Sequence, residues 1–99
     1  MAKLTITVEI DDKTLGYYFG PSFSNYWCRV ARDESGVYDV HDFVADKHYA
    51  FRKSDLVEGL QRLAQISPYQ FGQILQGKGD MWTTDALFQA TVLGEILYA

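Results

Sequence analysis

The sequence predicts an α+β domain, in which a small, mostly antiparallel sheet packs on two to four helices and the C-terminal helix is central. Three observations predict this class. Residues 3–10 alternate between apolar and polar side chains, short β-prone runs flank a polar turn at 33–36, and the second half carries helix caps followed by apolar stripes. The order of strand, helix, strands and then helices is typical of the α+β class. At 99 residues, the chain is expected to form one globular domain over residues 1–99.

The first predicted element is a half-buried strand at Lys3–Ile10. Its apolar side chains fall at every second position, namely Leu4, Ile6, Val8 and Ile10. Asp11 and Asp12 end the strand, and a carboxylate there can cap a helix by accepting from its free amide groups.

The next stretch, Lys13–Trp27, predicts a kinked helix or two short helices. Pro21 interrupts the helical pattern because proline has no amide hydrogen to donate. The segment is dense in aromatic side chains, namely Tyr17, Tyr18, Phe19, Phe23, Tyr26 and Trp27. Aromatic residues stabilise cores and interfaces alike, so both uses stay open.

A hairpin and a third strand are predicted in the middle of the chain. The runs Cys28–Arg32 and Val37–Val40 flank a polar turn that ends in Gly36. A third run, His48–Arg52, places Tyr49 and Phe51 on one face and can complete a small antiparallel sheet.

Two helices follow. Ser54 opens the first, and its apolar stripe is formed by Leu56, Val57, Leu60, Leu63 and Ala64. The second has the clearest local signal in the chain, because Ser67 is a cap, Pro68 is at the first helical position and Gln70 lies three residues after the cap. It is expected to present Phe71, Ile74 and Leu75 and to end at Gly77.

Thr83 or Thr84 is predicted to cap the last helix, with Asp85 in its first turn, and the helix is predicted to continue to the final residues. One apolar row contains Ala86, Ala90, Leu93 and Leu97, widened by Leu87 and Ile96. Gly94 falls inside this helix, where glycine costs about 0.5–1 kcal/mol relative to alanine. We therefore expect another backbone or a Trp ring to approach Gly94 closely.

Composition excludes several function classes. The formal net charge is −4, which disfavours direct nucleic-acid binding because that requires a basic face. Cys28 is the only cysteine, so no internal disulfide can form and a reducing compartment is favoured. The absence of an apolar run of about 18 residues and of a signal-peptide pattern predicts a soluble, cytoplasmic protein without membrane contact.

Three groups of residues are candidates for chemistry. Residues of metal-ligand type crowd one window, namely Asp39, His41, Asp42, Asp46 and His48, but their spacing matches no familiar motif and also fits a polar connection between strands. No neighbour in the sequence activates Cys28 as a nucleophile with a histidine base. The segment 77–80 lacks the Ser or Thr that follows Lys in a phosphate-binding loop. We expect no catalytic residue, no bound metal and no cofactor.

A partner-binding surface is the stronger expectation. An acidic stretch could imitate a row of phosphates and occupy a basic groove, and it consists of Asp33, Glu34, Asp39, Asp42 and Asp46. The alternative is a solvated hairpin edge whose charges prevent aggregation, and three nearby cations dilute the acidity. Tyr17 and Phe23 are added as aromatic contacts for the same partner.

Two segments resemble a family of small phage and prophage proteins of unassigned role. The first is Gly20-Pro21-Ser22-Phe23-Ser24-Asn25-Tyr26-Trp27, and the second is the run from Thr83 to Ala99 with its Gln and Gly-Glu-x-x-Tyr. The chain departs from the family pattern at Gly20-Pro21-Ser22, at Leu93 and at Ala99. The resemblance implies a structural role for the matching residues, namely Asn25, Tyr26, Trp27, Asp85, Gln89, Gly94, Glu95 and Tyr98. It implies no activity.

The resulting functional hypothesis is a non-enzymatic phage accessory protein in the host bacterial cytoplasm. It is expected to bind and inhibit a host protein, such as a nucleic-acid-binding defence complex, in the manner of anti-CRISPR proteins. Two alternatives stay open. One is a metal-dependent binder or enzyme that uses His41, His48 and nearby carboxylates, and the other is a structural or regulatory homodimer. Asp85, Gln89 and Glu95 are expected to hold neighbouring backbone or Trp27 in place.

Overall fold

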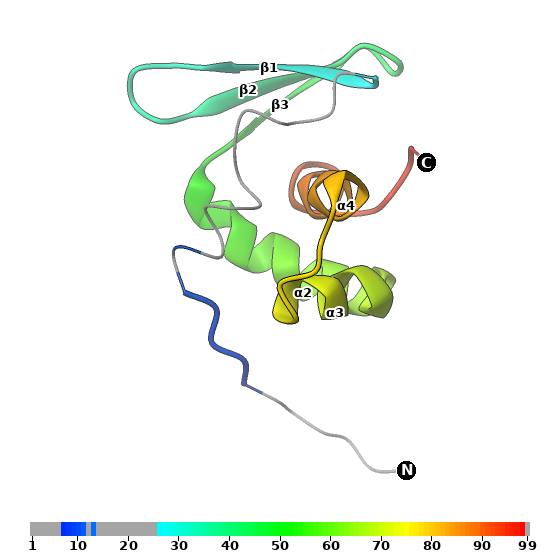
Figure 1. Ribbon diagram of the computed structural model, residues 1–99. Helices are drawn as coiled ribbons and strands as arrows, with labels where there is room; N and C mark the ends of the chain where they lie inside the picture. The colour runs from blue at the N-terminus through cyan, green and yellow to red at the C-terminus, as the bar shows by residue number, and fades with distance from the viewer. Residues whose placement is uncertain (1–6, 12, 14–25, 99) are drawn as a thin grey trace.

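The computed structural model describes residues 7–11, 13 and 26–98. Along these ranges the elements are strands β1 (Cys28–Arg32), β2 (Tyr38–Asp42) and β3 (Lys47–Phe51), a short 3-10 turn (Lys53–Asp55), and helices α2 (Leu56–Ile66), α3 (Pro68–Leu75) and α4 (Met81–Val92). This is the predicted α+β fold. In Figure 1 the sheet forms one layer, α2 and α3 form another, and α4 lies between them.

The three strands form an antiparallel sheet in the order β1-β2-β3. Strand residues alternate between its two faces, and Val40 and Phe51 project towards the helices and are buried. The predicted hairpin and the predicted third strand are therefore confirmed. Both were predictable because alternation and a polar turn are local features of the sequence.

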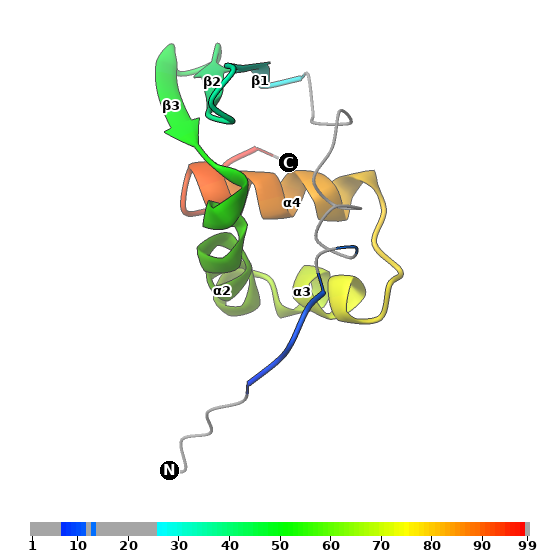
Figure 2. The same ribbon diagram turned by 90° about the vertical axis from the view of Figure 1, so that its left-hand side faces the viewer.

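Helix α4 is central, as predicted. Every residue from Thr83 to Thr91 is buried, including Phe88, which contacts Phe51 edge-on with ring centroids 5.5 Å apart. Below it, α2 contributes Leu56, Leu60 and Leu63 to the same core. Figure 2 shows α4 running between the sheet and the layer of α2 and α3.

Close packing between α2 and α4 depends on Gly59. A Cβ added at this residue would overlap Thr91 Oγ1 and lie 2.8 Å from Thr91 Cβ. The glycine therefore allows the two helices to approach more closely than a side chain would permit.

Both ends of α4 differ from the prediction. Asp80 caps the helix and accepts from the amides of Trp82 and Thr83, so the helix starts at Met81 and neither Thr83 nor Thr84 is its cap. It ends at Val92, and Gly94 adopts φ +80° beyond it. Gly94 is therefore a helix-terminating residue, and no atom lies within 4 Å of a Cβ built there.

Three further predictions need correction. Residues 7–10 are not in a strand, and Val8 is exposed, so the described part of the Lys3–Ile10 strand is wrong. Val57 is exposed on α2, outside the buried stripe. Tyr26 and Trp27 form a bend and not a helix. The rest of the Lys13–Trp27 prediction, with Tyr17, Phe23 and Asn25, falls almost entirely outside the described residues.

In the part of the chain that the structure describes, no helix has the length and apolar character needed to cross a membrane.

Candidate functional site

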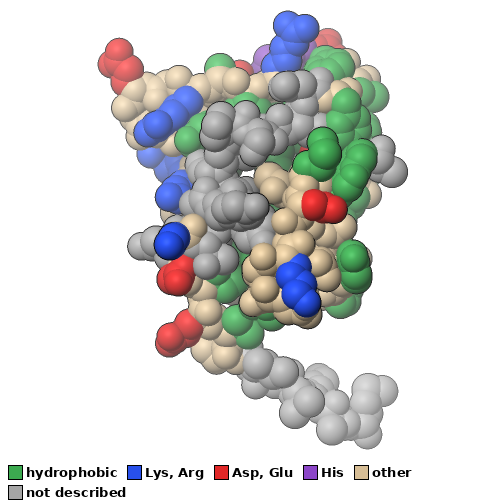
Figure 3. Space-filling model, viewed as in Figure 1, with side chains coloured by type: hydrophobic (Ala, Val, Ile, Leu, Met, Phe, Trp, Pro, Cys, Tyr) green, Lys and Arg blue, Asp and Glu red, His purple; other side chains and the backbone are tan. Residues whose placement is uncertain are grey.

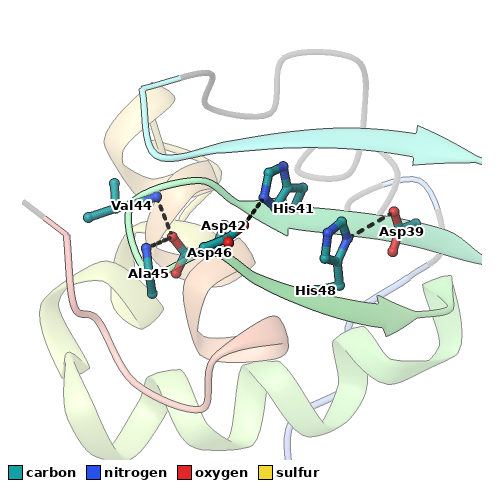
Figure 4. A network of polar contacts seen from close by, with 7 residues as sticks. All are labelled: Asp39, His41, Asp42, Val44, Ala45, Asp46 and His48. Atoms are coloured by element: carbon teal, nitrogen blue, oxygen red, sulfur yellow. Dashed lines mark hydrogen bonds and ion pairs between the residues drawn. The ribbon is translucent and has the colours of Figure 1, made fainter.

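The face of the sheet turned away from the helices is the candidate functional site, and we call it the open face. It carries Arg29, Asp39, His41 and His48. Figure 3 shows histidine side chains beside Lys and Arg side chains at the sheet end of the molecule. His41 on β2 pairs with His48 on β3 and with Arg29 on β1. Figure 4 shows both imidazole rings projecting away from the helices. The rings are stacked, with centroids 4.3 Å apart and planes 3° from parallel.

Each imidazole has its own carboxylate. His41 Nε2 lies 3.0 Å from Asp46 Oδ1, and His48 Nδ1 lies 3.6 Å from Asp39 Oδ2 (Figure 4). The Asp46 side chain is 88% exposed and the His48 side chain 62% exposed, so solvent weakens both contacts. These two contacts on the open face therefore contribute little to stability.

The predicted metal-ligand residues do not converge on one point. A metal lies in the plane of each imidazole that binds it, and the parallel planes of His41 and His48 share no such position. Among the described residues, no group of three or more His, Cys, Asp or Glu side chains could hold a metal ion.

Asp42 belongs to the opposite face of the sheet, because β2 alternates, and it is 1% exposed. Its Oδ1 accepts from the amides of Val44 and Ala45, and its Oδ2 accepts from the Tyr98 hydroxyl at 2.7 Å. Burial acts to raise the pKa of Asp42, but these three hydrogen bonds outweigh it and the pKa is lowered. Burial thus removes Asp42 from the surface predicted to meet a partner.

The other acidic residues are exposed but dispersed. Asp33 and Glu34 lie in the turn between β1 and β2, at the opposite end of the sheet from Asp46. Asp33 Oδ1 accepts from the Ser35 hydroxyl and from the amides of Val37 and Ser35, and these bonds lower its pKa. Because a strand rises about 3.3 Å per residue, the two turns are separated by roughly 16 Å along β2.

A buried polar network joins the C-terminal segment to α4. Asp85 accepts from Trp27 Nε1 at 3.0 Å, from the Tyr26 hydroxyl at 2.9 Å and from Gln89 Nε2 at 2.7 Å. Gln89 also accepts from the amides of Leu97 and Tyr98, and it donates to the Tyr98 carbonyl. The expected contacts of Asp85 with Trp27 and of Gln89 with neighbouring backbone are therefore present. Glu95 is exposed.

Tyr98 connects this network to the sheet. Its ring stacks on Trp27, with centroids 5.2 Å apart, while its hydroxyl donates to Asp42. The hydrogen bond to Asp42 and burial raise the pKa of Tyr98 to about 12. Burial followed by the hydrogen bond to Asp85 raises the pKa of Tyr26 to about 12. Both tyrosines are therefore neutral donors at physiological pH.

Cys28 is buried next to this network. Burial, followed by the charges of Asp85 and Asp42, raises the pKa of its thiol to about 12. A nucleophilic cysteine requires a thiolate near neutral pH, so Cys28 is unsuited to that chemistry.

Sequence reasoning missed two features of this region. The stacking of His41 on His48 depends on strand register, which the hairpin turn and the two strand ranges could have indicated. The contact between Asp42 and Tyr98 joins residues 56 positions apart, so no local signal predicts it. The burial of Asp42 had one signal, which is that Asp42 lies two residues after Val40 and therefore on the same face of the strand.

Comparisons with protein-family models, curated proteins and solved structures found no match to this chain. The class that the structure defines is an α+β domain with an open sheet face.

Proposed function

We propose that this chain is a non-enzymatic phage accessory protein that acts in the bacterial cytoplasm by binding and inhibiting a host protein. The target class we favour is a nucleic-acid-binding defence complex, bound in the manner of anti-CRISPR proteins. The phage origin rests on the resemblance of residues 20–27 and 83–99, and the acidic net charge of −4 favours a partner with a basic surface.

The observation that carries the proposal is the arrangement of exposed charge on the open face. Asp39 and Asp46 flank the stacked His41 and His48 rings, and hydrogen bonding orients the Asp46 carboxylate. Both carboxylates are more than half exposed, so they are accessible to Lys or Arg side chains of a partner. They also accelerate and orient encounter with a basic groove.

The test is suppression of CRISPR immunity in a bacterial host, measured as phage plating efficiency, together with co-purification of the tagged chain. We expect Asp39→Asn combined with Asp46→Asn to reduce both suppression and co-purification. Asparagine tolerates the positive φ of 53° at residue 46, so the backbone of the turn should persist.

The matched control is Glu58→Gln, which removes a carboxylate that is 64% exposed on α2, away from the open face. It should leave both readouts unchanged. If the unchanged chain neither suppresses immunity nor retains a host partner, the proposal is wrong. Equal losses in the control would indicate a net-charge effect and contradict the role of the open face.

Two other functions are tested separately. The adjacent histidines favour a metal-dependent binder as the second candidate, in which side-chain rotation would let His41 and His48 share an ion. Stoichiometric zinc or iron that is lost with His41→Ala would establish it. A homodimer is the third candidate, and a mass that stays monomeric at all concentrations in light scattering would exclude it.

A further inference from the structure

Strand β3 lies at the edge of the sheet, and one side of its backbone is open. In an antiparallel sheet, alternate residues of a strand direct their backbone groups to opposite sides. The hydrogen bonds at both ends of the β1–β2 ladder fix this alternation, so His48 and Ala50 direct their amides and carbonyls away from β2. Among the described residues, no strand pairs with this side of β3. Each of the two residues therefore offers a donor and an acceptor to an added strand.

The side chains above this edge favour arginine. The His48 ring presents one face to His41 and the other to the space beyond β3, because the two rings are stacked 3° from parallel. Figure 4 shows Asp39 beside His48, with Asp39 Oδ2 3.6 Å from His48 Nδ1. Asp39 lies opposite Ala50, whose small side chain leaves the carboxylate open to the edge. A ring face and a carboxylate side by side match a guanidinium, which stacks on aromatic rings and pairs with carboxylates through two nitrogens.

The charges on this side of the sheet support the same choice. Asp39 and Asp46 place two exposed carboxylates on the open face, whereas Arg29 lies two strands away on β1. Lys47 projects from the opposite face of β3, because strand residues alternate. A lysine from an added strand would pair with a carboxylate alone, since its ammonium group has no planar surface to stack on a ring.

We infer that the outer edge of β3 binds an extended segment of the host partner, and that an arginine of this segment lies over Ala50 against the His48 ring and pairs with Asp39. This rests on the proposed function of a host-protein binder and names the backbone form and the residue by which a basic partner is recognised. Backbone pairing supplies affinity and the arginine supplies specificity. The β3 strand of a second copy contains no arginine.

The test is an NMR titration of the full chain with a synthetic peptide of alternating threonine and valine that has one central arginine. The peptide should shift the amide signals of His48 and Ala50 and protect both amides from hydrogen exchange, because an added strand accepts from them. A matched peptide with lysine in place of arginine should bind about fivefold more weakly. Asp39→Asn should remove this difference, whereas the matched control Glu34→Gln, at an exposed residue in the turn between β1 and β2, should retain it.

The variant Ala50→Pro tests the edge itself. Proline removes the outward amide at residue 50, and the pairing of β3 with β2 does not use that amide. Peptide binding should therefore be lost while the amide spectrum of the folded chain persists. Should this variant not fold, protection of the His48 and Ala50 amides in the unchanged chain and the loss of arginine preference in Asp39→Asn still decide the question.

Several results would overturn the inference. These are no binding of the arginine peptide, protection confined to other elements, equal affinity for the two peptides, or unchanged binding by folded Ala50→Pro. A dimer that Ala50→Pro dissociates would assign the edge to a second copy and would also overturn it. The variants separate this inference from the proposed function. Peptide binding at the edge without suppression of immunity refutes only the function, whereas suppression that Ala50→Pro leaves intact refutes only the inference.

Discussion

Replacing Gly59 with alanine should destabilise the protein, although alanine is the better helix former. An added Cβ would overlap Thr91 Oγ1 and would lie 2.8 Å from Thr91 Cβ and 2.9 Å from its Cα. A rotation of the Thr91 side chain cannot relieve the overlap with the backbone, so α2 and α4 must move apart. Overpacking costs about 1–3 kcal/mol, and an overlap that reaches the backbone falls in the upper part of that range, at about 2–3 kcal/mol. The better helix propensity of alanine offsets about 1 kcal/mol of this cost. We expect a net loss of about 1–2 kcal/mol.

Urea unfolding monitored by tryptophan fluorescence measures this loss, because Trp27 is fully buried. With a slope of about 2 kcal/mol per M, the midpoint should fall by roughly 0.5–1 M. Gly72→Ala is the matched control, since no atom lies within 4 Å of its added Cβ in α3, and it should raise stability by about 0.5–1 kcal/mol. In a Thr91→Ala background, Gly59→Ala should still destabilise the chain, because the overlap with the backbone of residue 91 remains. A midpoint for Gly59→Ala at or above that of the unchanged chain would refute the close approach of α2 and α4.

Three other measurements test the cap, the thiol and the buried carboxylate. Asp80→Ala should lower the free energy of unfolding in urea by about 1 kcal/mol, because two amides at the start of α4 lose their acceptor. An unchanged midpoint would indicate that Thr83 or Thr84 is the cap. The Cys28 thiol, with its pKa raised to about 12, should not react with a disulfide reagent at pH 8 until urea unfolds the chain, and rapid reaction of the folded chain would contradict its burial. Because the folded-state pKa of Asp42 is lowered, its contribution to stability is present above the unfolded value of about 3.9 and is lost as the pH falls through the folded value. Tyr98→Phe removes a donor, so acid unfolding should begin at a higher pH, and an unshifted acid transition would argue against the contact with Asp42.

Much of the fold was predictable because its signals are local. The polar turn at 33–36 and the cap and proline of Ser67 and Pro68 act within a few residues, and the structure contains both the hairpin and α3. Helix α4 shows where local signals compete. Asp80, Thr83 and Thr84 are all acceptable caps, and the Thr83 hydroxyl instead donates to Gln70 Oε1 of α3. The prediction for Gly94 was wrong because an apolar row continues past it, whereas its left-handed backbone ends the helix.

The candidate site was less predictable because it depends on which strand face each residue occupies. The sequence window containing Asp39, His41, Asp42, Asp46 and His48 looks like one acidic and histidine-rich cluster. Alternation along β2 divides it, since Asp39 and His41 face solvent whereas Asp42 points to the helices. A one-residue change of register would exchange these two sets, and the register is set by the turn and the strand ranges, not by the types of the polar residues in the window.

The division of that window also explains how the open face is held on the helical layer. Asp42 is the inward acidic residue, and its bond to the Tyr98 hydroxyl joins the end of β2 to the segment that Gln89 fixes on α4. The stacking of Tyr98 on Trp27 reinforces the same junction from the start of β1. A disturbance at Asp42, Gln89 or Tyr98 should therefore reach the open face, even though Asp42 and Gln89 are themselves inaccessible to a partner.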